Sequence, residues 1–158
     1  MNFEIERSFL ISVDRFYNQQ NQLKKFREEF GSRFVFFNKY ITDENFSKAA
    51  VVPMATEEWM VEIVLIKNEM TTNQCVDFLL KTRNARFMGP QAFSYVFEKK
   101  RELLPKGKIV AIHSEEYLLK EGGEYLIPYM NINNSYNIFN LRFLSLPIEE
   151  GERVIYFR

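Results

Sequence analysis

Residues 58–66, with the sequence EWMVEIVLI, constrain the fold more than any other segment of the chain. Apart from Glu62, the run from Trp59 is apolar at both odd and even positions. A strand points alternate side chains to opposite faces of its sheet, so this strand would present an apolar surface on both faces. We therefore predict a central strand that is covered on both sides.

Three helices are predicted around this strand. Residues 19–30 place Leu23, Phe26 and Phe30 on one face and are followed by Gly31. A second helix begins near Thr71 or Thr72 and ends near residue 83. A third begins at Pro90, whose missing N–H is unneeded at the first helical position, and is stopped by the sequence Pro-Lys-Gly at 105–107.

The sequence from residue 108 onward is typical of strands separated by turns. Five short β-rich segments occupy 108–112, 116–120, 124–132, 136–146 and 153–157. Their spacing favours an antiparallel meander, with Pro128 at an edge or a bulge because proline cannot donate to a ladder. With earlier strands at 3–13 and 33–38, we predict one α+β domain over residues 1–158, whose C-terminal antiparallel meander packs against about three helices.

The composition favours packing and binding over catalysis. The chain has 16 Phe, 8 Tyr and 1 Trp but a single histidine, His113, and a single cysteine, Cys75. Acid–base, nucleophilic and metal chemistry draws mostly on His, Cys and clustered carboxylates. We therefore expect a non-catalytic protein without a cofactor. The N-terminal segment lacks a basic, apolar leader, so we expect a cytoplasmic protein without a membrane partner.

Aromatic residues in the C-terminal half lead to the first functional hypothesis. Tyrosines placed on strands can leave one face of a sheet half exposed, and tyrosine is enriched at protein interfaces. We therefore predict a protein-interaction or regulatory module that binds a protein partner, or a second copy of itself as a homodimer. Its predicted contact residues are Tyr117, Tyr125, Tyr129 and Tyr136.

Charge segregation leads to an alternative hypothesis. The chain carries 21 basic and 21 acidic side chains, but residues 81–108 hold eight bases and only two acids. If two helices placed these bases side by side, the surface would bind nucleic acid or another anion. A solvated helix face gives the same pattern. The eight bases are Lys81, Arg83, Arg86, Lys99, Lys100, Arg101, Lys106 and Lys108.

A further alternative comes from residues 4–11, EIERSFLI. Glu4 and Glu6 are two positions apart, so both carboxylates of a regular strand point to one side. The segment resembles the opening strand of the CYTH or triphosphate-tunnel family, which begins with E-x-E-x-K. The resemblance implies that Glu4 and Glu6 bind a divalent metal in a degenerate triphosphate-tunnel phosphohydrolase. Ser8 stands where the family has its lysine, and a solvated edge strand also explains the pattern.

His113 is the one imidazole with carboxylates close in sequence, at Glu115 and Glu116. A base or metal ligand could be built from such neighbours. The sequence supplies neither a second histidine nor a cysteine at suitable spacing, and a turn histidine explains the position. We therefore predict no catalytic residue here.

Overall fold

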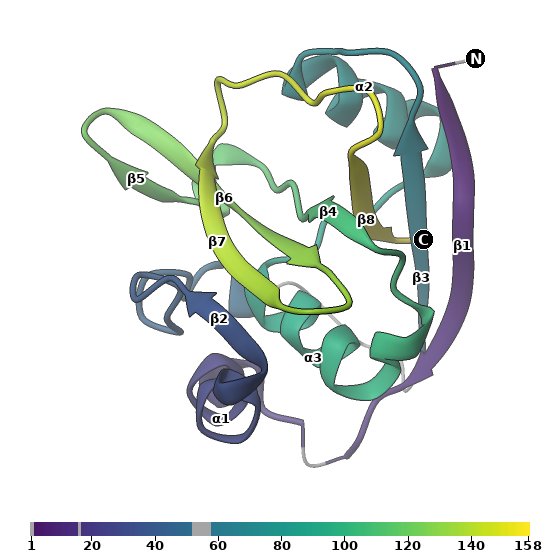
Figure 1. Ribbon diagram of the computed structural model, residues 1–158. Coiled ribbons are helices and arrows are strands. Elements are labelled where there is room, and N and C mark those ends of the chain that lie inside the picture. The colour runs from purple at the N-terminus through teal and green to yellow at the C-terminus, as the bar shows by residue number, and fades with distance from the viewer. Residues whose placement is uncertain (1, 16, 52–57) are drawn as a thin grey trace.

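The described residues form a mixed sheet of eight strands with α-helices on both faces, which confirms the predicted α+β fold (Figure 1). This is a computed structural model, and it describes residues 2–15, 17–51 and 58–158. The strands are β1 (Phe3–Ser12), β2 (Phe34–Phe37), β3 (Glu58–Ile66), β4 (Gly107–Val110), β5 (Leu119–Glu121), β6 (Glu124–Ile132), β7 (Asn137–Phe143) and β8 (Arg153–Phe157). The α-helices are α1 (Gln22–Phe30), α2 (Thr72–Arg83) and α3 (Pro90–Lys100).

Strand β3 lies inside the sheet, between β1 and β8, and is buried on both faces as predicted. Trp59, Val61 and Ile63 point into the core shared with α1 and α3. Val64 and Ile66 point into the second core, under α2. The two apolar sides of one strand therefore fix the two helical layers of the molecule.

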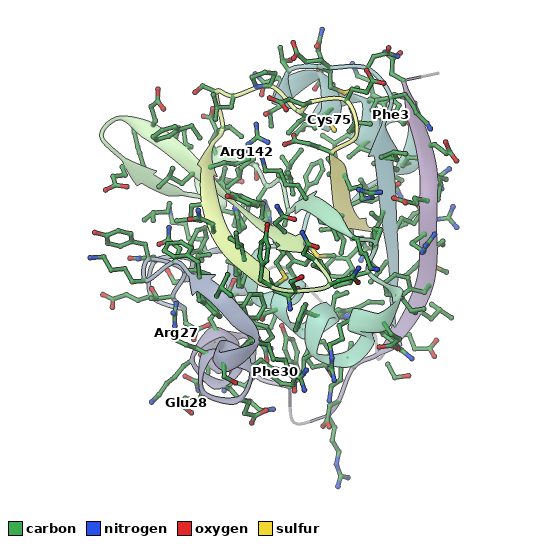
Figure 2. The ribbon with its side chains drawn as sticks, viewed as in Figure 1. Phe3, Arg27, Glu28, Phe30, Cys75 and Arg142 are labelled. Atoms are coloured by element: carbon green, nitrogen blue, oxygen red, sulfur yellow. The ribbon has the colours of Figure 1, made fainter. Side chains whose placement is uncertain are left out.

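The first core is largely aromatic. Phe26 of α1 makes ring contacts with Phe34 of β2, Phe97 of α3 and Phe139 of β7, at centroid distances of 5.7, 5.7 and 6.2 Å. One ring thereby joins two helices to one end of the sheet. The second core is smaller and contains Cys75, which lies on α2 near Phe3 (Figure 2). Burial raises the pKa of the Cys75 thiol to about 12, which suits an inert packing residue.

The predicted starts of α2 and α3 are confirmed, whereas the first helix, predicted from residue 19, begins at Gln22 after a short 3₁₀ turn over Gln19–Asn21. The Thr71 hydroxyl accepts from the Gln74 N–H at 3.1 Å, and the Gln74 side chain accepts from the Thr71 N–H at 2.9 Å. Helix α3 begins at Pro90 after Gly89, where an added Cβ would lie 2.4 Å from the Cβ of Ala49. A larger residue at 89 would therefore push α3 away from residue 49. No helix in the described part of the chain is long and apolar enough to cross a membrane.

Strands β5, β6 and β7 form an antiparallel meander as predicted, but β4 pairs with β6 instead of β5, and β8 leaves the meander. Strand β8 pairs with β4 in parallel and with β3 in antiparallel, so that Ile155 lies opposite Ile63. All four residues from Val154 to Phe157 are buried. A segment without a polar face needs cover on both sides, which a place in the middle of the sheet provides. Strand β2 also adds a second parallel pairing, with β7.

Two local predictions in this half were wrong. Pro128 lies in β6, an interior strand, and not at an edge. The Pro128 carbonyl accepts from the Ala111 N–H, just past the end of β4. The backbone nitrogen of Pro128, which has no hydrogen to donate, therefore lies where the pairing between β4 and β6 ends. Tyr117 lies in a short 3₁₀ turn, Glu115–Tyr117, and the strand begins only at Leu119.

Candidate functional site

An exposed apolar strip runs along β2, the strand at one end of the sheet (Figure 1). Phe34 and Phe37 pack inward against the aromatic core. Val35 and Phe36 point outward and are 69% and 49% exposed. The register shifts between Phe34 and Phe36 against β7, so Val35 is the extra residue of an irregularity in the pairing. Because both outward side chains are apolar, solvent meets a hydrophobic edge here.

Two tyrosines extend this strip at its ends. Tyr136 directly precedes Asn137, the partner of Phe34 in the register, and Tyr40 follows β2 by three residues. Both rings are exposed. We call the four residues Val35, Phe36, Tyr40 and Tyr136 the β2 strip. An apolar cluster of this kind on an edge strand is a recurrent form of protein-binding surface.

The four tyrosines predicted from the sequence do not share one surface. Tyr136 belongs to the β2 strip, whereas Tyr117 stacks on His113 at a centroid distance of 4.4 Å. Tyr125 and Tyr129 lie on β6 and are partly buried, and the Tyr129 hydroxyl accepts from the Asn140 side chain at 3.3 Å. The sequence shows where the tyrosines occur along the chain but not how exposed each side chain is, because exposure depends on which strands lie next to it.

The structure does not bring the eight bases of residues 81–108 together. Lys81 and Arg83 end α2, which covers one face of the sheet, while Lys99 and Lys100 end α3 on the other face. The sheet therefore separates the two groups. The other four bases lie elsewhere. The backbone of Arg86 forms an isolated β-bridge with Phe157. Arg101 begins a 3₁₀ turn, Lys106 follows that turn, and Lys108 lies on β4.

Glu4 and Glu6 each have their own cationic partner. Glu4 pairs with Lys67 at 2.6 Å, and Glu6 accepts from two nitrogens of Arg153. The Arg153 hydrogen bond lowers the pKa of Glu6, against the opposing effect of burial. The register shifts between Ile5 and Arg7, which interrupts the regular alternation. Within residues 2–15, 17–51 and 58–158, no three His, Cys, Asp or Glu residues are grouped to hold a metal.

Glu62, the single acid within the apolar part of β3, lies at the centre of a buried polar cluster. It is bound by Arg83 of α2 at 2.8 Å and by the Tyr156 hydroxyl of β8 at 2.6 Å. Burial and the bond to Glu62 raise the pKa of Tyr156, so the phenol stays protonated. The cluster ties the end of α2 to the sheet. A lone acid in a central strand was a sequence signal for such a buried partner.

His113 is buried between Phe87 and Tyr117 and is not paired with the acids that follow it. Its Nδ1 accepts from the Ser114 N–H at 2.9 Å, which places the proton of the neutral ring on Nε2. Nε2 is buried and has no hydrogen-bond partner among the described residues. Burial lowers the pKa of His113 to about 4, so the ring is neutral at pH 7.

This burial predicts acid sensitivity. The unfolded chain takes up a proton at His113 near pH 6.5, whereas the folded chain resists it until about pH 4. The contribution of His113 to the free energy of unfolding is therefore fully present above pH 6.5. As the pH falls toward 4, the free energy of unfolding decreases by about 3 kcal/mol because of this residue. His113→Asn keeps an acceptor for Ser114 but does not titrate. Urea unfolding at pH 7 and pH 4.5 should show a smaller acid loss in the variant; equal losses would contradict the assignment.

Comparison with known proteins returns no match: no family model, no curated protein and no solved structure is similar to this chain. We therefore infer function from the chain's own residues. Among its surfaces, the β2 strip combines exposed aromatic and aliphatic side chains with a place at the end of the described sheet.

Proposed function

We propose that this chain is a non-catalytic protein-interaction module that binds its partner along the β2 strip. The observation that carries the proposal is the exposure of Val35 and Phe36, two adjacent apolar side chains on an edge strand. The exposed side chains would supply apolar contact. An added strand from the partner would pair with the backbone groups of β2 that face away from β7, apart from the Phe37 carbonyl, which accepts from Arg27 at 3.4 Å. The partner is a second copy of the chain or another protein with an extended apolar segment.

The length of β2 and its irregular register fit regulated binding better than open-ended aggregation. The strand has only four residues, and the shift at Val35 interrupts regular pairing. Short and bulged edge strands limit uncontrolled strand addition. A partner must therefore complement the side chains of the strip as well as the backbone.

Phe36→Ser should weaken binding about tenfold or more, because aromatic anchors carry much of the energy of an interface. Leu10→Ser on β1 is the matched control, since Leu10 is 51% exposed on the opposite edge strand of the sheet. Light scattering measures self-association, and capture from a host lysate with mass spectrometry measures other partners. A monomer that captures nothing, or a complex that Phe36→Ser leaves unchanged, would refute the proposal.

Two alternative functions stay predictions. Nucleic-acid binding through residues 81–108 predicts an affinity that falls steeply with salt and is lost when Lys99, Lys100 and Arg101 are reversed to Glu. A degenerate phosphohydrolase that uses Glu4 and Glu6 predicts hydrolysis of tripolyphosphate or nucleoside triphosphates with magnesium or manganese. Neither has the support of a gathered set of side chains comparable with the β2 strip.

A further inference from the structure

A hollow of about 360 Å³ lies between strands β4, β6 and β7 and the segment that joins β7 to β8. The joining segment is held in place by the Thr72 hydroxyl, which donates to the carbonyls of Leu144 and Leu146, and by a backbone bridge between Met70 and Ile148. The hollow is therefore a built feature of the fold. Its volume is at the lower end of the range for small-molecule sites.

Two cations share one buried carboxylate beside this hollow. Arg142 of β7 donates to Glu152 at 2.9 Å, and Lys108 of β4 binds the other oxygen of Glu152 at 2.8 Å. Burial alone would raise the pKa of Glu152. The hydrogen bonds from Lys108 and the Glu149 N–H, with the charge of Arg142, reverse this and leave the pKa below its ordinary value. The triad of Lys108, Arg142 and Glu152 carries one excess positive charge, and the exposed Glu149 carboxylate at the border of the hollow offsets it.

Arg142 also has an unused donor. The residue is only 8% exposed, and its Nη1 and Nη2 donate to Glu152 and to the Pro147 carbonyl. Its Nε is buried and has no hydrogen-bond partner within the described residues. A buried donor without an acceptor is costly. Because this nitrogen has almost no accessible surface, a ligand oxygen in the hollow reaches it only when the guanidinium shifts toward the hollow.

The remaining walls are mostly apolar. Phe143 and Leu146 border the hollow and are exposed to solvent, and Leu126 and Leu141 lie deeper. Tyr129 also borders it, with the Lys108 ammonium 5.0 Å from its ring centroid. A site with a cationic end and apolar walls is suited to a ligand with an anionic group and an apolar body.

We propose that this hollow binds a small monocarboxylate with an aliphatic or aromatic body. The carboxylate accepts from Lys108 Nζ and, once the guanidinium shifts, from Arg142 Nε, and the apolar body lies against Phe143 and Leu146. A carboxylate brings only one negative charge to these two cations. A phosphate dianion would instead bring surplus negative charge close to Glu152 and Glu149. The proposal is independent of the β2 strip, which shares no residue with the hollow.

Calorimetric titration with octanoate tests the assignment. We expect saturable one-to-one binding to the full chain, with octanol and octylamine weaker by about tenfold or more because neither supplies an anion. Lys108→Gln should weaken octanoate by about tenfold, with Lys106→Gln, an exposed neighbour, as its control. Leu146→Asp should abolish binding, whereas Leu80→Asp on α2 should not; these two side chains are 47% and 49% exposed.

Arg142 is left intact in these variants because it belongs to a buried ion pair, and circular dichroism checks that each variant is folded. Failure of millimolar octanoate to bind would overturn the proposal. Equal binding of octanol would also overturn it, because the hollow would then be only an apolar depression. So would unchanged affinity in both Lys108→Gln and Leu146→Asp.

Discussion

Replacing Glu152 with Ala should lower the free energy of unfolding by about 3–5 kcal/mol, because it leaves a buried guanidinium without its counter-charge. Arg142 is held by Glu152 in a region where both side chains are almost fully buried. Glu4→Ala is the control. Glu4 also forms an ion pair, with Lys67, but both side chains are largely exposed, so its loss should cost less than about 1 kcal/mol.

Chemical denaturation of the two variants and the unchanged chain measures the difference. The double change Arg142→Met with Glu152→Leu should regain much of the stability, because neither buried charge remains. Equal effects of Glu152→Ala and Glu4→Ala would show that the triad does not behave as a buried cluster.

Phe26→Ala should be about as severe, with a loss of about 3–5 kcal/mol, since the ring is fully buried and joins both helices of its layer to the sheet. Phe36→Ala removes the same side chain from an exposed position on β2 and should change stability by less than about 0.5 kcal/mol. Thermal and urea unfolding measure both.

This pair separates the two uses of phenylalanine in the chain, as core and as binding surface. If Phe36→Ala proved as destabilising as Phe26→Ala, the side chain of Phe36 would be part of the core, and the β2 strip would lose its central residue.

Features determined by local sequence could be predicted. The apolar run of β3 identifies a central strand because both of its faces need cover, and Gly89 with Pro90 marks a helix start whatever the rest of the fold. The position of β8 could not be read in this way. Its pairing with β3 and β4 depends on contacts between residues distant in the sequence, such as Ile155 and Ile63.

The candidate sites follow the same division. The aromatic content of the C-terminal half predicts Tyr136 as a contact residue, but the sequence predicts Val35 and Phe36 only as part of a strand, since it does not say which side of β2 is left exposed. The triad of Lys108, Arg142 and Glu152 joins β4, β7 and the residue just before β8, so no spacing in the sequence reveals it. Residues 81–108 are the opposite case. Their basic residues are close together in the sequence, but the structure places them on opposite faces of the sheet.

We propose β2 as the edge at which this chain meets its partner. Hydrogen exchange read by mass spectrometry tests this on the free monomer and on the complex that the chain forms with itself or with a captured protein. We expect slower exchange of the amides in Phe34–Phe37 in the complex and unchanged exchange in β1, with Phe36→Ser removing the protection. Protection confined to β1, or none at β2, would contradict it.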